Sequence, residues 1–351
     1  MSETKSIRKF MIFGESGSGK TCYLAAMYNE LLKGIDGYTI STSDKTTEKK
    51  LRTYYDKILK QAEAGIERFP LATIDKDTKS FNLKIQFGAK LLAEFELTDY
   101  PGIFLDPIKN NPRKKKFKEF EQNVNNASMI FICVDDKYLV EGTVEEKIKR
   151  IKQNCAMNIN SYLGKRKKIP PVVIILTKYD LCAKNNSNKD INSIIAGAFE
   201  MLFKSDDTLV AIIPCSLGLN ISDNNYTGEL KPLNVHLPIL LGAIYAFLDY
   251  IYDDKAINFT QKTGMIFGDV YYNEWREQRN EFPSMKDELE EGLAYEIESD
   301  LEFIKNLAKN FPAITFFENG RMKTDSIIEA LDSWAYSLYD ENAEFTLGYL
   351  Y

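Results

Sequence analysis

The chain reads Gly14-Glu15-Ser16-Gly17-Ser18-Gly19-Lys20-Thr21 directly after the apolar run Ile7–Phe13 and directly before a stretch with helical spacing. Glycines let such a loop curl until successive N–H groups face one point, to which the N-terminus of the helix adds its positive end. The ammonium group of Lys20 can neutralise phosphate oxygens there, and the Thr21 hydroxyl can bind Mg²⁺. The setting of strand, loop and helix therefore predicts a phosphate-binding loop over these eight residues and Cys22.

Buried strands alternate with helical stretches along the first two thirds of the chain. The runs Met129–Val134, Val172–Leu176 and Leu209–Ile213 are too continuous in their hydrophobicity to be half exposed. A glycine turn between Phe81–Phe87 and Leu91–Leu97 predicts a hairpin. Together these patterns predict an α/β fold of three layers, with a central, mostly parallel sheet between helices.

The charge of the chain changes sign after Tyr252. The net charge is −6, but Asp253–Tyr351 carry 21 acidic and 9 basic residues, which leaves the preceding residues at +6. We therefore predict a basic nucleotide-binding domain over residues 1–252 and a small, mainly helical acidic region over residues 253–351. The acidic region either docks on the basic domain or is offered to a basic partner.

A second motif, Thr177-Lys178-Tyr179-Asp180, follows the buried run Val172–Leu176. It matters because a phosphate-binding loop alone does not separate ATP from GTP. A carboxylate at Asp180 can accept two hydrogen bonds from the guanine N1–H and exocyclic amine, which adenine does not offer. We predict that Asp180 reads guanine, that Lys178 lies along the base, and that Thr177 ties this loop to the phosphate-binding loop.

A third motif, Asp99-Tyr100-Pro101-Gly102, follows the second strand of the expected hairpin. An aspartate at that strand end can hold Mg²⁺ through water, and the glycine N–H can sense the terminal phosphate. The alternative is an ordinary turn, because Asp, Pro and Gly favour turns in any setting.

These motifs, in this order and followed by Cys215-Ser216-Leu217-Gly218, give the chain a family resemblance. It resembles the Ras-like P-loop GTPases of the translation-factor-related class. Within that class it is most similar to scattered bacterial GTPases associated with conflict and defence systems, which often carry Asp-Tyr-Pro-Gly at this place. The resemblance spans about Lys5–Tyr252, and it implies that Ser216 and Leu217 bring backbone N–H groups to the guanine O6.

The resemblance also implies a switch threonine that reaches Mg²⁺ when the terminal phosphate is present. Thr73 is the first candidate because it lies in an irregular segment just ahead of the hairpin, while Thr39 and Thr42 remain possible. The interval from the phosphate-binding loop to Thr73 is much longer than in small Ras proteins. Residues 38–73 are therefore expected to form a long switch I insertion that contains a helix.

Catalysis departs from the Ras pattern, because Ile103 follows Gly102 where Ras proteins place the glutamine that orients the attacking water. The hydrolysis of GTP is therefore expected to be slow in the protein alone. Either a partner completes the site or another residue does, with Arg68 as a candidate internal arginine finger. The candidate catalytic residues are Lys20, Thr73 and Gly102, and the candidate Mg²⁺ ligands are Thr21, Thr73 and, through water, Asp99.

Three functions compete on these residues. The leading hypothesis is a switch that hydrolyses GTP to GDP and phosphate with Mg²⁺, stimulated by a protein activator and read by an effector. Its rival is a scaffold that holds a guanine nucleotide without hydrolysing it and recruits partners through the acidic region. The third is an ATPase, which tight ATP binding insensitive to a change at Asp180 would reveal.

Composition narrows the remaining possibilities. Five singly spaced cysteines and a single histidine, His236, argue against a C-x-x-C zinc or redox site and against a histidine-based metal site. The expected location is the cytoplasm, because no apolar run reaches the ~18–20 residues of a membrane span and the first residues lack a leader pattern. Nucleic-acid binding is not expected, because no aromatic residues interleave with the basic clusters Arg113–Lys116 and Lys165–Lys168.

Overall fold

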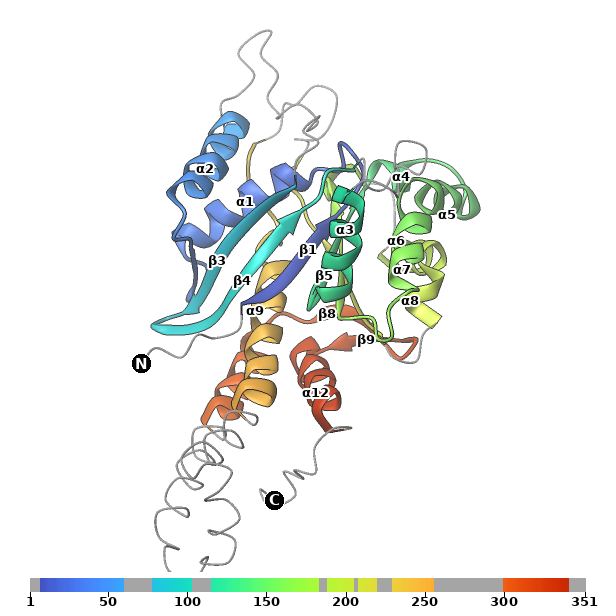
Figure 1. Ribbon diagram of the computed structural model, residues 1–351. Helices are drawn as coiled ribbons and strands as arrows, with labels where there is room; N and C mark the ends of the chain where they lie inside the picture. The colour runs from blue at the N-terminus through green and yellow to red at the C-terminus, as the bar shows by residue number, and fades with distance from the viewer. Residues whose placement is uncertain are drawn as a thin grey trace, which may run out of the picture. The chain divides into compact units, whose positions relative to one another are not determined.

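A mixed sheet runs through the part of the chain that the computed structural model describes, namely residues 7–59, 78–102, 115–182, 188–204, 208–219, 229–255 and 299–340. Within these residues nine strands pair in the order β2-β3-β4-β1-β5-β6-β7-β8-β9 (Figure 1). The strands are β1 (Arg8–Phe13), β2 (Tyr38–Ser41), β3 (Lys79–Phe87), β4 (Lys90–Asp99), β5 (Met129–Asp135), β6 (Val172–Thr177), β7 (Leu209–Pro214), β8 (Ile314–Glu318) and β9 (Arg321–Asp325).

The centre of this sheet is parallel, as the sequence predicts. β1 pairs in parallel with β4 on one side and with β5 on the other, and β6 and β7 continue the parallel set. The outer strands β2, β3, β8 and β9 pair antiparallel. Every residue of β5 and β6 is buried, because a parallel sheet is covered on both faces.

Helices supply the two outer layers, which confirms the predicted three-layer α/β fold (Figure 1). On one face the buried core joins the sheet to helices that precede β5, β6 and β7, through residues such as Phe120, Ile151, Ile159 and Ile195. These helices are α3 (Lys115–Asn126), α4 (Lys137–Val140), α5 (Val144–Ile151), the π-helical turn η2 (Lys152–Ala156), α6 (Met157–Leu163), α7 (Asn188–Ala198) and α8 (Glu200–Lys204). The other face carries α1 (Lys20–Lys33) and α9 (Leu237–Asp249).

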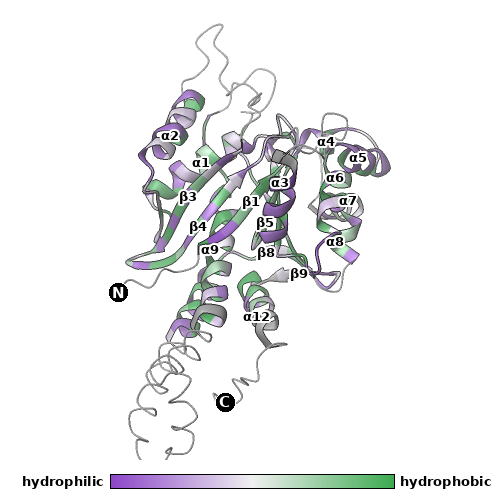
Figure 2. Ribbon diagram, in the orientation of Figure 1, coloured by the Kyte–Doolittle hydropathy of each residue, from purple (hydrophilic) through white to green (hydrophobic). Residues whose placement is uncertain are grey.

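The segment between α1 and β3 contains the edge strand β2 and the helix α2 (Lys45–Leu59). Asp44 starts α2, because its carboxylate accepts hydrogen bonds from the N–H groups of Thr46 at 2.9 Å and Thr47 at 3.2 Å. The apolar side of α2 packs on α1, where the Tyr55 hydroxyl donates to Glu30 Oε1 at 3.2 Å. Figure 2 shows that α2 is mostly hydrophilic, and its buried residues are Thr47, Leu51, Tyr55 and Ile58.

A hairpin from near the end of the chain extends the sheet beyond β7. Asn319 and Gly320 connect β8 to β9, and both have positive φ angles, 50° and 71°, as a two-residue hairpin turn requires. β8 pairs antiparallel with β7, so that Phe317 lies opposite Val210 and packs on Phe203 with ring centroids 4.5 Å apart. The predicted division of the chain after Tyr252 stays a prediction, and the sheet takes two strands from beyond it.

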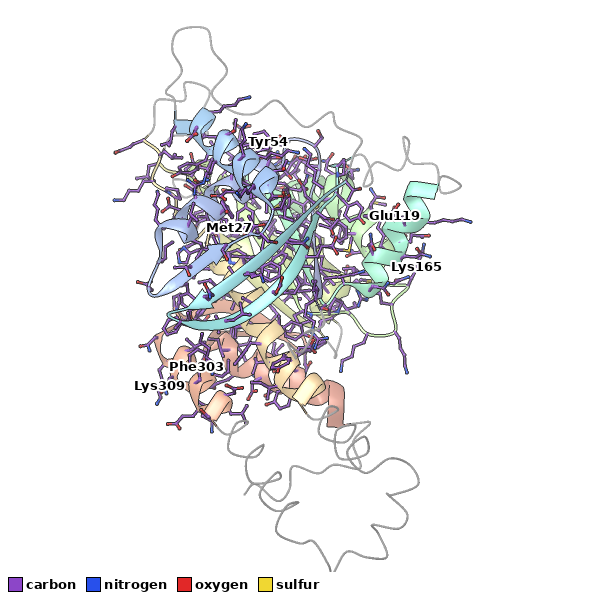
Figure 3. All side chains as sticks on the ribbon, turned by 60° about the vertical axis from the view of Figure 1, so that its left-hand side comes forward. Met27, Tyr54, Glu119, Lys165, Phe303 and Lys309 are labelled. Atoms are coloured by element: carbon purple, nitrogen blue, oxygen red, sulfur yellow. The ribbon has the colours of Figure 1, made fainter. Side chains whose placement is uncertain are left out.

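The described residues divide into two compact units. One unit holds the whole sheet, with residues Ile7–Ala243 and Ile314–Asp325. The other includes a helix over residues 299–310, on which Figure 3 labels Phe303 and Lys309, and α12 (Ile327–Asp340). Within this second unit the Phe247 and Phe303 rings pack 5.9 Å apart, and the Tyr252 hydroxyl donates to Asp332 Oδ1 at 2.6 Å. Residues 256–298 lie outside the described part.

Candidate functional site

The predicted phosphate-binding loop connects the carboxyl end of β1, within the parallel part of the sheet, to α1. Gly14, Gly17 and Gly19 have φ angles of 155°, 82° and 82°, a region that side-chain-bearing residues rarely adopt. At Gly14 a Cβ would also lie 2.8 Å from the carbonyl oxygen of Cys133 on β5. The loop therefore has the curled backbone that a phosphate cradle needs, held tightly against the neighbouring strand.

Lys20 is folded back over this loop. Its ammonium group donates to the carbonyl oxygens of Gly14 at 2.6 Å and Glu15 at 2.8 Å, and the residue is only 8% exposed. The next residues, Thr21 and Cys22, lie in the first turn of α1, and burial raises the pKa of the Cys22 thiol to about 12. The positive charge of Lys20 therefore lies at the N-terminus of α1, where the helix dipole also favours an anion.

Asp99 ends β4 beside Ile12 of β1 and is 8% exposed. Its Oδ1 is buried and has no hydrogen-bond partner in the described part of the chain. Burial raises the pKa of this carboxyl group, which the nearby Lys20 ammonium opposes. A buried carboxylate oxygen left without a donor fits the second coordination shell of Mg²⁺, whose bound waters would supply the missing hydrogen bonds.

Gly102 touches the phosphate-binding loop directly. A Cβ at this position would lie 2.2 Å from the Ser16 nitrogen and 2.6 Å from the Glu15 carbonyl carbon, so no other residue fits without displacing the loop. The motif Asp99–Gly102 thus lies on the flank of the loop, where the resemblance places the terminal phosphate. Ile103, Arg68 and Thr73 lie outside the described residues. Of the alternative switch threonines, Thr39 is paired in β2, and the Thr42 hydroxyl accepts the N–H of Asp44.

The base-reading motif follows β6 and is bonded to the phosphate-binding loop. The Thr177 hydroxyl donates to the carbonyl oxygen of Ser18 at 2.6 Å. Lys178 has a φ of 60°, and its ammonium donates to the carbonyl oxygen of Gly17 at 3.1 Å. Asp180 follows in a short 3-10 turn, η3 (Tyr179–Leu181), and is 3% exposed. Two side chains of the motif therefore fix its position relative to the phosphate loop.

The loop after β7 lies beside this motif, because the N–H of Tyr179 donates to the carbonyl oxygen of Cys215 at 3.1 Å. Ser216 was predicted to donate its N–H to the guanine O6. In the structure this N–H donates instead to the carbonyl oxygen of Leu233 at 3.2 Å. The N–H of Leu217 has no hydrogen-bond partner among the described residues, although its carbonyl accepts from Lys231. Of the two predicted donors, only the N–H of Leu217 is therefore left without a partner in the described part of the chain.

Three residues that no sequence motif marks also belong to the site, namely Asp135, which ends β5, and Lys137 and Tyr138, which follow it. The Tyr138 hydroxyl donates to Glu15 Oε1 at 2.5 Å, and the Lys137 ammonium pairs with the same oxygen at 2.9 Å. Asp136 is fully buried, and burial together with the neighbouring Asp135 raises its pKa to about 8. The available signal was the polar run directly after a buried parallel strand, since ligands bind at the carboxyl ends of such strands.

The basic cluster Lys165–Lys168 has structural contacts. The Arg166 guanidinium donates to the carbonyl oxygens of Val124 and of Ala127, the latter at 3.0 Å, where α3 ends. Lys165 lies beside α3 and pairs with Glu121 Oε1 at 2.8 Å (Figure 3). Satisfying the last carbonyls of a helix is an ordinary use of arginine, so these contacts account for two of the four basic residues. In the other cluster, Arg113 and Lys114 lie outside the described residues.

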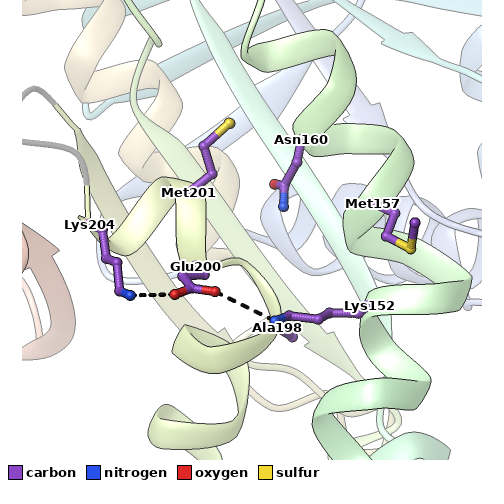
Figure 4. Close-up of a pocket in the computed structure, with 7 residues that line it drawn as sticks. All are labelled: Lys152, Met157, Asn160, Ala198, Glu200, Met201 and Lys204. Carbon is purple, nitrogen blue, oxygen red and sulfur yellow. Dashed lines mark hydrogen bonds and ion pairs between the residues drawn. The ribbon is translucent and has the colours of Figure 1, made fainter.

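A groove of about 430 Å³ lies between the η2–α6 segment and α7–α8, away from all these motifs (Figure 4). It is lined by Lys152, Met157, Asn160, Ala198, Glu200, Met201 and Lys204. Glu200 binds both lysines of the groove, Lys204 by a hydrogen bond and Lys152 at 3.6 Å. The groove therefore offers no unpaired cation to a phosphate.

The helices of the described residues include none that combines the length and the hydrophobicity needed to cross a membrane.

Comparison with known proteins gives one family match. A model of the family Double-GTPase 2 (DO-GTPase2) matches residues 11–213, which include every described site residue except Ser216 and Leu217. Among curated proteins no match was found.

Several solved structures are similar in part. The mammalian SRP receptor is 16% identical over 60% of this chain and 91% of its own, with a TM-score of 0.34. The GTPase-like domain of Ski7 from S. cerevisiae, bound to GTP, is 16% identical over 68% of this chain and 50% of its own, with a TM-score of 0.37. Era from Aquifex aeolicus is 16% identical over 68% of this chain and 56% of its own, with a TM-score of 0.31.

Proposed function

The chain belongs to the Double-GTPase 2 family, and from that premise we propose that it is a switch that binds GTP and hydrolyses it to GDP and phosphate. The observation that carries the proposal is the bond between its two recognition loops, in which Thr177 Oγ1 donates to the Ser18 carbonyl at 2.6 Å. This contact holds a phosphate cradle and a guanine-reading carboxylate in one fixed arrangement, which positions a nucleotide for in-line attack.

The chain's own groups divide the work of hydrolysis. The loop N–H groups and the Lys20 ammonium hold the phosphates and stabilise the charge that develops as water attacks the terminal phosphorus. Asp180 and the Leu217 N–H hold the base. Mg²⁺, held by Thr21, Thr73 and through water by Asp99, would neutralise phosphate oxygens. Gly102 would sense the terminal phosphate through its N–H.

The proposal also includes slow hydrolysis of GTP by the protein alone and a protein partner that accelerates it. The chain has Ile103 where a water-orienting glutamine stands in Ras proteins, so we infer that an activator supplies the missing group. The acidic residues beyond Tyr252 are the candidate contact for an effector. A role in bacterial conflict or defence is also part of the proposal, and its support is the sequence resemblance alone.

Single-turnover release of phosphate from bound GTP tests the proposal. The wild-type protein should release phosphate slowly with Mg²⁺, and Lys20→Ala should abolish both binding and release. A protein that binds GDP tightly yet never releases phosphate, with or without proteins that co-purify with it, would be a scaffold and not a hydrolase. A protein that binds neither GTP nor GDP would overturn the proposal entirely.

A further inference from the structure

Asp135, the last residue of β5, lies between two lysines and is 1% exposed. Its Oδ2 is 2.7 Å from the Lys178 ammonium and 3.5 Å from the Lys137 ammonium. Its Oδ1 accepts the backbone N–H of Lys137 at 3.0 Å. The carboxylate of Asp135 is thus paired with one close and one more distant ammonium group. Such pairing is needed because an unpaired charge is costly to bury.

Both lysines also contact the phosphate-binding loop, each at a different residue. The Lys178 ammonium also donates to the carbonyl oxygen of Gly17 at 3.1 Å. The Lys137 ammonium also pairs with Glu15 Oε1 at 2.9 Å. A chain of charged contacts therefore runs from Glu15 through Lys137, Asp135 and Lys178 to Gly17, and Asp135 is its central member.

We propose that Asp135 is a positioning residue for nucleotide binding, which holds the Lys178 ammonium in place so that this side chain can lie along the guanine base. This inference rests on the proposed function. A lysine side chain loses rotamer entropy when it is fixed in one position. Asp135 already fixes Lys178 by binding the lysine's ammonium group before the nucleotide arrives. Nucleotide binding therefore costs less side-chain entropy, and the nucleotide binds more tightly.

The isosteric change Asp135→Asn isolates this role. An asparagine keeps the oxygen that accepts the Lys137 N–H and removes the charge that holds Lys178. The matched control is Asp136→Asn, the same change one residue along, at a fully buried carboxyl group outside the chain of contacts. Calorimetric titration with GDP and Mg²⁺ at pH 7 should show about tenfold weaker binding for D135N, the loss of roughly one charged contact, and binding within about twofold of wild type for D136N.

A double-mutant cycle separates positioning from a general structural role. Lys178→Met should weaken GDP binding by itself, and adding D135N to it should cost nothing more, because no ammonium is left to position. Asp135→Glu, which keeps the charge, should restore most of the affinity that D135N loses. Additive losses in the cycle, or unchanged GDP affinity in D135N, would overturn the inference.

Two further results keep this test separate from other failures. If wild-type protein fails to bind GDP, the proposed function fails and not the role of Asp135 alone. If D135N does not fold, as judged by its thermal melting without nucleotide, Asp135→Ser replaces it, because serine keeps an acceptor for the Lys137 N–H. The same loss of affinity and the same non-additivity are expected of D135S.

Discussion

At the scale of single residues, we expect the choice of base to depend on Asp180. Replacing this carboxylate with an amide turns one acceptor into a donor, so Asp180→Asn should no longer match the guanine amine but should match a carbonyl at the same ring position. D180N is expected to lose at least about 100-fold in GTP affinity and to prefer xanthosine triphosphate. Competition binding with GTP, ATP and xanthosine triphosphate measures the change. Unaltered GTP preference would contradict the role of Asp180.

Asp136 predicts a pH-dependent stability. Its pKa of about 8 lies far above the ordinary value of an aspartate, so the folded state holds its proton more strongly than the unfolded state. The stability that this group contributes is complete below about pH 4 and is lost as the pH rises toward 8. Asp136→Asn does not ionise, so its free energy of unfolding relative to wild type should rise across that range, by a few kcal/mol as an order of magnitude.

Urea unfolding at pH 5, 7 and 8.5 measures this difference. The control is Asp56→Asn on the exposed side of α2, for which the difference from wild type should stay level with pH. A level difference for D136N as well would show that Asp136 is charged in the folded protein.

At this scale the sequence could predict the site residues that lie next to one another in the chain, but not those that only the fold brings together. The residues of Gly14–Thr21 and Thr177–Asp180 carry their meaning in consecutive positions, so both stretches could be recognised without a fold. Asp135 differs, because its partners Lys178 and Glu15 come from loops after β6 and β1 that only the sheet brings beside β5. The hydrogen bond from the Ser216 N–H to Leu233 could not be predicted for the same reason, because the two residues are distant in the sequence.

At the scale of elements, aromatic rings connect α3 to the motif Asp99–Gly102. Phe120 of α3 is fully buried and packs on Tyr100 at 4.8 Å and on Phe13 at 5.7 Å between ring centroids. Asn123 of the same helix donates to the Tyr100 hydroxyl at 2.6 Å. Because Tyr100 stands between Asp99 and Gly102, a displacement of Gly102 by the nucleotide would be transmitted to α3.

Phe120→Ala should lower the free energy of unfolding by about 3–5 kcal/mol, because it removes a buried ring and leaves a cavity between α3 and the sheet. Phe120→Leu, which fills most of that space, should cost less than half as much. Chemical denaturation measures both. A loss below about 1 kcal/mol for the alanine variant would mean that α3 is not anchored through this ring.

Most elements could be predicted from periodicity, and the exceptions have physical causes. The spacing of apolar residues over Val144–Leu163 is typical of one continuous helix, but the π-helical turn η2 interrupts it between α5 and α6. A turn with one extra residue shifts the buried face without altering composition, so a pattern of apolar positions does not reveal it. Similarly, Phe199 separates α7 from α8 within one helical pattern.

At the scale of the whole molecule, the sheet needs residues from beyond Tyr252. A chain of residues 1–252 would keep every predicted site residue but would leave β7 as an uncovered edge, with Leu209, Val210 and Ala211 no longer paired with β8. An open apolar edge strand pairs with other chains. Light scattering and gel filtration should therefore show that this truncated chain associates or aggregates, whereas the full chain does not. A monodisperse truncated chain that binds GDP would contradict this expectation.

The position of β8 was beyond sequence reasoning because strand order is not encoded in a strand's own residues. The pair Asn319-Gly320 is typical of a hairpin turn, but it does not identify β7 as the neighbouring strand, and the acidic composition around it suggested a separate region.

The late position of β8 and β9 also has a consequence for biosynthesis. About one hundred residues separate the end of β7 from the start of β8, and a ribosome adds roughly 5–20 residues per second, so β7 waits about 5–20 seconds for its partner. During that interval the nascent chain already contains every predicted site residue, but the edge of β7 that pairs with β8 is exposed. Chaperones that shield hydrophobic strands should therefore matter most for this protein while it is still being translated.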